Sequence, residues 1–271
     1  MNSADASLLN RDASLGAVAI RRVESEREYD ECVAIQRETW GRKFRETVPA
    51  TILRIAQEVG GVTAAAFDAN DAMIGFVFGI SGIRNGELAH WSDMLAIRSA
   101  ARDRGLGKRL KFYQRELLLA DGIRKMYWTF DPLVARNAYV NLQQLGARVT
   151  EYRTNYYGEH TGSVMHAGIG TDRFIVEWRL DDLEITACDG SKWESAPIVM
   201  PGAGEGSSAM DRVRIAVPDD VIAMLDHDIA TARRWREATR HAFTSYLANG
   251  YTVAGFTRAT DSRPATYLLE H

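Results

Sequence analysis

The segment that most constrains this chain is an apolar strand that ends in an arginine-rich, glycine-containing turn and leads directly into a helix. Met94–Ile97 end the predicted strand, Arg102–Lys108 form the turn, and the helix is predicted over 107–120. Such a turn points main-chain N–H groups outward at the positive end of the helix dipole. The sequence therefore predicts a site for a phosphate or pyrophosphate.

Two common phosphate-binding motifs do not fit this turn. A triphosphate-binding loop needs a glycine, four further residues and then Gly-Lys-Ser/Thr, but Arg102 and Arg109 stand at its first and last positions. A dinucleotide-binding Gly-x-Gly-x-x-Gly needs a third glycine, where this chain has Leu110. The order of elements predicted before the turn, two helices and then three strands, is also wrong for that fold.

The composition bounds the class of protein. The chain has 271 residues, 46% of them hydrophobic, which is enough for one large domain or two modest ones. A net charge of −3 gives no basic excess for nucleic acid, and no apolar run is long enough to span a membrane. Cys32 and Cys188 fit no metal spacing and suggest a reducing compartment. We expect a cytoplasmic protein with neither nucleic acid nor membrane as partner, and no metal.

Hydrophobic periodicity and turn residues predict two blocks of alternating elements. Residues 1–16 read as a flexible tail, 17–195 as the main domain, 196–211 as a Gly/Pro/Ser-rich linker or mobile loop, and 212–271 as a smaller extension that packs on the main domain. In the main domain we expect strands over 17–23, 64–68, 73–80, 88–97, 125–130, 147–152 and 174–180, a loop over 81–87, and helices over 26–40, 49–59, 107–120 and 135–145. In the extension we expect strands over 213–217, 251–257 and 266–269, with helices across 219–247.

The second block echoes part of the first. Seven positions match at a constant offset of 104, namely Arg136, Ala138, Tyr139, Leu142, Gly146, Val149 and Tyr152 with Arg240, Ala242, Phe243, Tyr246, Gly250, Val253 and Phe256. One interpretation is a duplicated strand–helix–strand unit that has lost its phosphate turn. The other is a chance similarity between amphipathic helices that end in glycine, because such helix ends are common.

The pattern Arg-x-x-Gly-x-Gly after an apolar strand, followed by strand–helix–strand, resembles the GNAT superfamily of acyl-CoA-dependent N-acyltransferases. The resemblance runs from about Ile20 to Leu180. A subgroup of predicted acetyltransferases with an extra C-terminal segment is similar over further runs, which are 128–133, 135–138, 155–158, 172–174, 177–178 and the Gly-Tyr-x-Val-x-x-Phe motif at 250–256.

The resemblance implies a fold and a cofactor site. We expect an α/β chain of the α+β type, with a mixed, mostly antiparallel central sheet flanked by helices and a smaller C-terminal α/β extension. The fourth and fifth strands would splay apart around the pantetheine arm of acetyl-CoA or another acyl-CoA. The residues implied to bind this co-substrate are Leu95, Ala96, Ile97, Arg102, Asp103, Arg104, Gly105, Leu106, Gly107, Lys108 and Asn137. Asp103 departs from the family, where glycine often follows the arginine, and Ser99 stands where proline is common.

Acyl transfer from a thioester needs a neutral amine, a donor for the oxyanion and a proton for the leaving thiolate. Asp93 is the first candidate base, because strand alternation would put it on the same face as Leu95; His90 is the second and Glu87 the third. The family's acid, a tyrosine, is replaced by Leu142, and its usual asparagine by Ala135. Tyr139, on the same helix, could supply the proton, as could water.

The acceptor is expected to be a small amine. Tyr156 and Tyr157 lie in a predicted loop, where aromatic residues often touch ligands. Arg136 and Arg173 could bind the carboxylate of an acceptor such as an amino acid. Two functions remain open: an N-acyltransferase that works by direct attack on the thioester, or a non-catalytic acyl-CoA sensor or assembly module. The oligomeric state also stays open, since exposed strands of the extension could pair two chains into a homodimer.

Overall fold

The computed structural model describes residues 11–12, 16–158, 160–163, 165, 168–182, 188–200 and 210–271. By backbone contacts the chain divides into two compact units, one of Met1–Trp128 with Arg179–Asp181, the other of Thr129–Trp178 with Asp182–His271. Most of the predicted tail and most of the predicted linker lie outside the described residues; of the tail, Arg11–Asp12 and Gly16 are described and lie in short strands. The sheets are mixed and mostly antiparallel, with helices on their faces, which confirms the predicted fold class.

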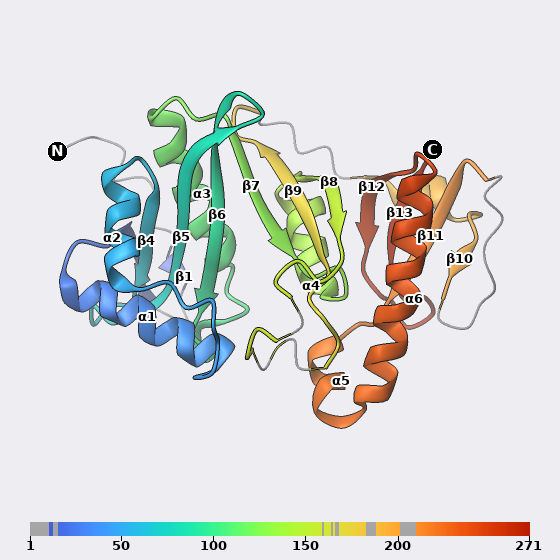
Figure 1. Ribbon diagram of the computed structural model, residues 1–271, viewed down its shortest axis with the longest axis horizontal. Coiled ribbons are helices and arrows are strands. Elements are labelled where there is room, and N and C mark those ends of the chain that lie inside the picture. Colours follow the sequence, from blue (N-terminus) through green and yellow to red (C-terminus); the bar gives the residue numbers. More distant parts are fainter. Residues whose placement is uncertain are drawn as a thin grey trace. The chain divides into compact units, whose positions relative to one another are not determined.

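The first unit is built on a twisted sheet in the order β3-β4-β5-β6-β7 (Figure 1). β3 (Ala19–Arg22), β4 (Val62–Phe67), β5 (Met73–Arg84) and β6 (Glu87–Ile97) are antiparallel, and β7 (Lys125–Phe130) runs parallel to β6. A short pair, β1 (Arg11–Asp12) and β2 (Gly16–Ala17), precedes them.

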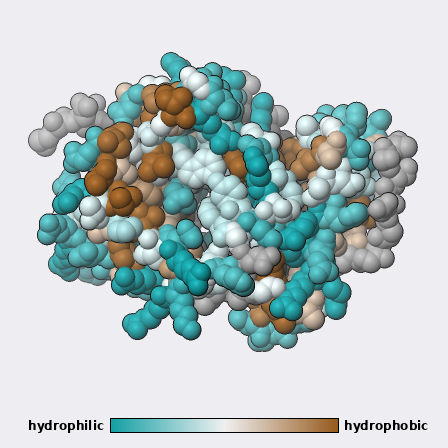
Figure 2. Space-filling model, in the orientation of Figure 1, coloured by the Kyte–Doolittle hydropathy of each residue, from teal (hydrophilic) through white to brown (hydrophobic). Residues whose placement is uncertain are grey.

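Helices cover both faces of this sheet, which is why every residue of β4 is buried. Figure 1 shows α1 (Glu26–Trp40) and α2 (Ala50–Glu58) on one face and α3 (Leu106–Ala120) on the other. α1 begins at a capping box, in which Ser25 and Glu28 satisfy each other's main-chain N–H groups. Figure 2 shows hydrophobic surface on the side of the molecule that carries α2, whose exposed apolar residues are Ile52, Ile55 and Val59.

The region 81–87, predicted as a loop, is instead the end of a long hairpin. β5 continues to Arg84 and β6 begins at Glu87, so only Asn85 and Gly86 form the turn. Both have positive φ, 53° and 81°, the geometry of a two-residue hairpin turn for which Asn-Gly is the favoured sequence. The Asn-Gly pair was the signal that the prediction missed.

The second unit contains the antiparallel strands β8 (Arg148–Arg153) and β9 (Arg173–Arg179), in the strand order β7-β9-β8, and a separate four-stranded sheet. α4 (Ala135–Ala138) and a π-helical turn, η3 (Tyr139–Gln144), connect β7 to β8, where a single regular helix was predicted. Gly146 closes this segment with φ 69°, as predicted for a left-handed cap.

The other sheet has the order β10-β11-β13-β12. β10 (Ile198–Val199), inside the predicted linker, pairs parallel with β11 (Arg212–Val217), and β12 (Thr252–Thr257) and β13 (Ala265–Glu270) complete it antiparallel. α5 (Val221–His227) and α6 (Ile229–Ala248) connect β11 to β12, and η5 (Gly190–Trp193) precedes β10. Figure 1 shows α6 crossing this sheet.

The offset of 104 holds in the structure as well as in the sequence. Both segments run strand–helix–strand–strand with the strand order first-third-second, β7-β9-β8 and β11-β13-β12. The register of each antiparallel pair shifts at the same place, between Val149 and Glu151 and between Val253 and Gly255. The glycines that end the two helical segments, Gly146 and Gly250, both have positive φ. These shared irregularities favour duplication over coincidence.

An aromatic cluster forms the core of the second unit. The Phe174 ring lies 4.8 Å from Phe243 of α6 and 5.4 Å from Tyr267 of β13, centroid to centroid. Phe243 and Tyr267 meet edge to face at 5.2 Å, and Tyr267 lies 4.8 Å from Phe256. Edge-to-face pairs add stability beyond the burial of their area, so this cluster ties β9 to α6, β12 and β13.

We therefore expect Phe243→Ala to lower the free energy of unfolding by about 3–5 kcal/mol, because the side chain is fully buried and its removal leaves a cavity in the cluster. Urea unfolding followed by circular dichroism measures this change. Thr244→Ala, at the exposed neighbouring position, is the matched control and should change stability by less than about 0.5 kcal/mol. Equal stabilities of the two variants would contradict this account of the core.

Candidate active site

The predicted phosphate turn joins β6 to α3. After Ile97 the chain makes one 3₁₀ turn, η2 (Ser99–Ala101), and reaches α3 through Arg102–Gly105. Asp103 and Gly105 have positive φ, 66° and 70°. Asp is among the few non-glycine residues that adopt this conformation readily. Asp103 therefore fits the position at which the family that the sequence resembles often has glycine.

The start of α3 carries main-chain donors that the protein does not use. Its N-cap is Gly105, which has no side chain to cap the helix, and Arg109 is the first residue whose N–H bonds back, to the carbonyl of Gly105. Within the described part of the chain, the N–H groups of Leu106, Gly107 and Lys108 meet no acceptor. These donors stand at the positive end of the helix dipole, where an anion is stabilised.

The space next to the turn is open. A Cβ at Gly105 would meet no atom within 4 Å, so glycine is needed there for its φ and not for lack of room. Arg102 is exposed and its Nε donates to the carbonyl of Ile97 at 3.0 Å, which closes the turn. Asp103 is exposed, and Arg104 and Lys108 are half-buried. Lys108 lies with its Nζ 5.7 Å from the centroid of the Phe112 ring.

β6 and β7 part beside this turn. Their described register pairs are His90 with Met126 and Trp91 with Tyr127, at the beginning of β7. No partner on the β7 side is found for the rest of β6 among the described residues, and this stretch includes Leu95, Ala96 and Ile97. Main-chain groups on that edge of β6 are therefore outside the sheet ladder, as the predicted splay requires.

β6 also contains a bulge at Asp93. Ser92 is opposite Gly79 and Met94 opposite Phe78, so Asp93 has no partner in the register. The hydroxyl of Ser92 bonds to Gln114 of α3, whereas Met94 belongs to the core cluster under α1 and α2. The bulge thus interrupts the simple alternation of side chains between Ser92 and Met94, the alternation on which the predicted common face of Asp93 and Leu95 depends. Leu95 lies on the α3 side, 3.4 Å from where a Cβ of Gly107 would be.

Asp93 is solvent-exposed but surrounded by enough protein to alter its proton affinity. Desolvation raises the pKa of its carboxyl, and the charge of Glu46, in the segment between α1 and α2, raises it further. A carboxylate with a raised pKa is a stronger base. Glu87, the third candidate, forms an ion pair with Lys125 and is not held near this bulge by any described contact.

His90 is a structural residue in this arrangement. It is fully buried, with its Nδ1 2.9 Å from Ser81 Oγ and its Nε2 2.9 Å from Gln114 Nε2. Burial, and then the nearby charge of Lys111, lower the pKa of His90 to about 3. Its ring also lies over Gly79, where a Cβ would come within 2.2 Å of Nε2. Neither nitrogen is left for an amine, so the geometry does not favour His90 as a base.

His90 belongs to a chain of hydrogen bonds with one direction. Lys111 Nζ donates to Ser92 Oγ (2.7 Å), Ser92 to Gln114 Oε1 (2.8 Å), and Gln114 Nε2 to His90. His90 Nδ1 then donates to Ser81, whose hydroxyl donates to the carbonyl of Gly60 at 2.6 Å. The direction follows from the Gly60 end, because a carbonyl can only accept: Ser81 donates to it and so accepts from His90 Nδ1. It fixes the neutral Nδ1–H tautomer of His90.

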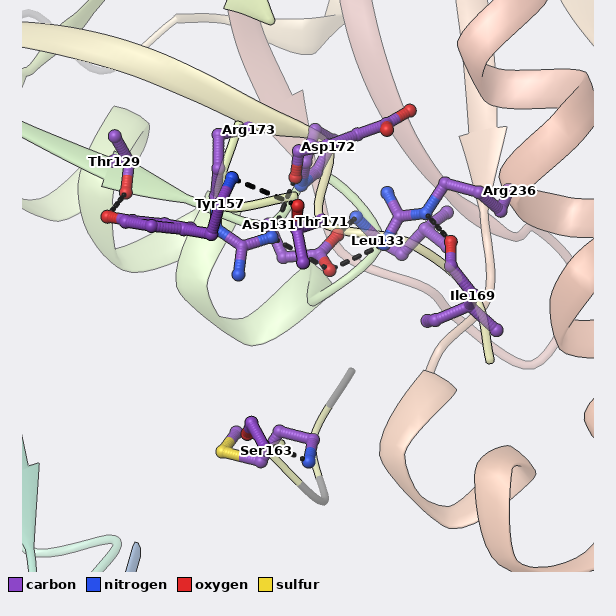
Figure 3. A network of polar contacts seen from close by, with 12 residues as sticks. Thr129, Asp131, Leu133, Tyr157, Ser163, Ile169, Thr171, Asp172, Arg173 and Arg236 are labelled. Carbon is purple, nitrogen blue, oxygen red and sulfur yellow. Dashed lines mark hydrogen bonds and ion pairs between the residues drawn. The ribbon is translucent and has the colours of Figure 1, made fainter. Parts of the chain in front are cut away.

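In the second unit, Asp131 follows β7 and lies between two arginines (Figure 3). Arg236 Nη2 donates to Asp131 Oδ2 at 2.5 Å, and Arg173 Nη1 lies 3.4 Å from the same oxygen. All three residues are buried. Burial alone would raise the pKa of Asp131, but the two guanidinium charges outweigh it and lower the pKa. Arg173, predicted to bind substrate, is thus held by Asp131 and by the main-chain carbonyl of Asp172.

Three arginines of α6 hold the segment between β8 and β9. Arg233 Nε donates to the carbonyl of Gly168 at 2.8 Å, and Arg236 Nε to that of Ile169 at 3.1 Å. Arg240 donates to both carboxylate oxygens of Asp172, at 2.6 and 2.9 Å, and to Asn155 Oδ1. Because these arginines lie three and four residues apart, they form one face of the helix.

The remaining predicted residues also lie in the second unit. Arg136 and Asn137 are exposed on α4. Tyr139 is half-buried, and the guanidinium carbon of Arg258 lies 4.4 Å from its ring centroid. Tyr156 and Tyr157 pack edge to face at 4.8 Å, and the Tyr157 hydroxyl lies 2.9 Å from Thr129 Oγ1. The π-helical turn that follows Ala138 is a feature often found at functional sites.

In the described residues, no group of three or more His, Cys, Asp or Glu side chains is arranged to hold a metal ion. Among the described helices, none has the length and hydrophobicity of a membrane span.

Three solved structures to which the chain is similar are acetyltransferases. An aminoglycoside 6'-acetyltransferase type Ii has 18% identity and a TM-score of 0.47, covering 60% of this chain and 97% of its own. A GNAT superfamily phosphinothricin acetyltransferase from Sinorhizobium meliloti, in complex with AcCoA, has 15% identity to this chain and a TM-score of 0.49. The match covers 64% of this chain and 94% of that one. A GNAT-family acetyltransferase from Streptococcus pneumoniae has 19% identity to this chain and a TM-score of 0.47. The match covers 60% of this chain and 99% of that one. No protein-family model and no curated protein sequence matches the chain.

The buried lysine gives a prediction on stability. Burial lowers the pKa of Lys111 from 10.5 to about 7. The unfolded chain therefore binds more protons than the native one between these values, so the free energy of unfolding should rise with pH there, by about 1.4 kcal/mol per pH unit. The full cost of the charge is present below pH 7.

Urea unfolding of the wild type and of Lys111→Met between pH 6.5 and 10 gives the free energy of unfolding of each protein. The free energy of unfolding of the wild type should rise relative to that of the variant as pH rises. A difference that does not depend on pH would show that Lys111 keeps its ordinary proton affinity.

Proposed function

We propose that this chain is an acyl-CoA-dependent N-acyltransferase that passes an acetyl or other short acyl group to the amine of a small molecule. The observation that carries the proposal is the turn between β6 and α3, with its unused N–H groups at the start of a helix. The diphosphate of coenzyme A fits these donors, because several amides and a helix dipole together bind such an anion.

The parting of β6 and β7 supports the same co-substrate. An acyl-pantetheine arm contains amides that need donors and acceptors from main chain, and the edge of β6 beyond Trp91 supplies them. Residues Leu95–Ile97 lead from this edge directly into the phosphate turn. One continuous stretch of chain would therefore hold both the arm and the diphosphate.

The chemistry assigned to the chain is direct attack of a neutral amine on the thioester carbonyl. Asp93, with its raised pKa, accepts the proton that the amine loses. A main-chain N–H of the bulge near Met94 or Leu95 stabilises the oxyanion that forms. The departing thiolate takes its proton from water or from Tyr139, because Leu142 is buried and carries no proton to give.

The acceptor is proposed to be a small amine, such as an amino acid. Arg136 and Arg173 are the residues proposed for a substrate carboxylate; Arg136 is exposed on α4, and Arg173 is buried beside Asp131. Tyr156 and Tyr157 are proposed to contact the acceptor. The proposed location is the cytoplasm, and a homodimer is the proposed alternative to a monomer.

The phosphate site is tested by Lys108→Glu. A carboxylate in the first turn of α3 stabilises the helix by about 0.3–1 kcal/mol through its dipole, but it repels a diphosphate. Calorimetric titration should therefore show coenzyme A affinity reduced by about tenfold or more, in a variant at least as stable as the wild type. Lys192→Glu, the same change at an exposed position of the second unit, should bind normally. Unchanged binding by Lys108→Glu would place the diphosphate elsewhere.

Catalysis is tested by thiol release from acetyl-CoA and succinyl-CoA over a panel of amino acids and amines. Asp93→Asn should lower kcat by about 10²–10⁴-fold and leave coenzyme A affinity unchanged. Loss of the rate at low pH, as Asp93 takes up a proton at its raised pKa, should disappear in the variant. Coenzyme A binding by the wild type without turnover of any amine would favour the alternative, an acyl-CoA sensor or assembly module.

A further inference from the structure

Lys111 lies where β6 and β7 separate. The last pair in the register of these strands is Trp91 with Tyr127, and the next residues along them are Ser92 and Trp128. The ammonium of Lys111 touches both: its Nζ is 2.7 Å from Ser92 Oγ and 4.0 Å from the centroid of the Trp128 ring. It also lies 3.9 Å from Met126 Sδ.

This ammonium is unusual because it is buried without a carboxylate. Lys111 is 6% exposed, and within the described residues it forms no ion pair. One hydroxyl, one aromatic face and one thioether compensate for the water it has lost. A lysine in an apolar interior is costly compared with a methionine of similar length, so stability does not explain its presence.

We propose that Lys111 is a positioning residue that keeps β6 and β7 apart where the acyl-pantetheine arm lies and that, through Ser92, holds the bulge presenting Asp93. The inference rests on the function proposed above. It adds a residue that touches neither substrate nor reacting atoms but sets the geometry of the groups that do.

The contacts on either side of Asp93 explain how this works. Lys111 and Gln114 bind the hydroxyl of Ser92 from the α3 side, while Met94 is packed under α1 and α2 on the opposite side. The main chain between Ser92 and Met94 is thereby fixed at both ends, and the extra residue has to project. Without the amino group of Lys111, Ser92 loses a donor and the Trp128 ring loses this contact, which lets the two strands approach each other.

The experiment compares coenzyme A with ADP, a diphosphate that lacks the pantetheine arm. Lys111→Met fills the same volume without charge or donor, and Lys192→Met is the matched control on an exposed residue. We expect Lys111→Met to bind coenzyme A about tenfold more weakly and ADP within twofold of the wild type, because the amides of α3 are untouched. Its kcat should fall about 100-fold, as a small displacement of catalytic groups does.

Ser92 provides a second, independent variant. Ser92→Ala removes the acceptor of Lys111 and should reproduce the loss of kcat, while Ser92→Thr keeps the hydroxyl and should restore most of it. Rescue by threonine distinguishes positioning through the hydroxyl from a general loss of packing. If Ser92→Ala had wild-type kcat, the link from Lys111 to the bulge would be refuted.

The outcomes separate this inference from the proposed function. Equal affinity of Lys111→Met and wild type for coenzyme A, or equal losses for coenzyme A and ADP, would overturn the inference while the proposed function stands. Coenzyme A binding by the wild type without turnover would overturn the proposed catalysis, and the contrast between coenzyme A and ADP would still decide the role of Lys111 in spacing the strands. A wild type that binds neither ligand would overturn both.

Discussion

One extra residue in β6 determines the geometry of the candidate site. The bulge at Asp93 turns Ser92 toward α3 and Met94 toward α1 and α2, so the same strand satisfies a polar network on one face and a hydrophobic core on the other. Beyond this point β6 no longer pairs with β7, and its free edge leads to the turn at the start of α3. Main-chain groups on this edge of β6 thus lie outside the sheet ladder among the described residues.

The second unit depends on a different constraint, a buried carboxylate shared by two arginines. Asp131 stands directly after β7, and its partners come from β9 and α6, far away in the sequence. Removing one partner of such a buried set is costly because it leaves a charge unpaired. The aromatic cluster around Phe174 surrounds the same junction with apolar contacts. The ion pairs of Asp131 and the aromatic cluster thus join the same strands and helix, which is why the C-terminal segment forms one compact unit with β8 and β9.

Local signals in the sequence predicted most of the elements. The apolar stripe over 26–40 predicted α1 with its observed bounds, Glu26–Trp40, and the strand predicted over 125–130 matches β7. The turn between β6 and α3 was predictable because its glycines and arginines are contiguous. The network of Lys111, Ser92, Gln114 and His90 was not, because its members come from two elements and only the bulge brings them together. A lysine among the apolar positions of α3 was the available signal. Likewise, nothing local to Arg173 indicates Asp131 as its partner.

The duplicated segments differ most in the connection that follows their second strand. The stretch between β8 and β9 is much longer than the one between β12 and β13, and α6, the helix of the second copy, supplies the arginines that hold it. A long excursion of this kind is entropically expensive to order on its own. Hydrogen bonds from the helix of the second copy offset part of that cost, so the second copy stabilises a long connection of the first.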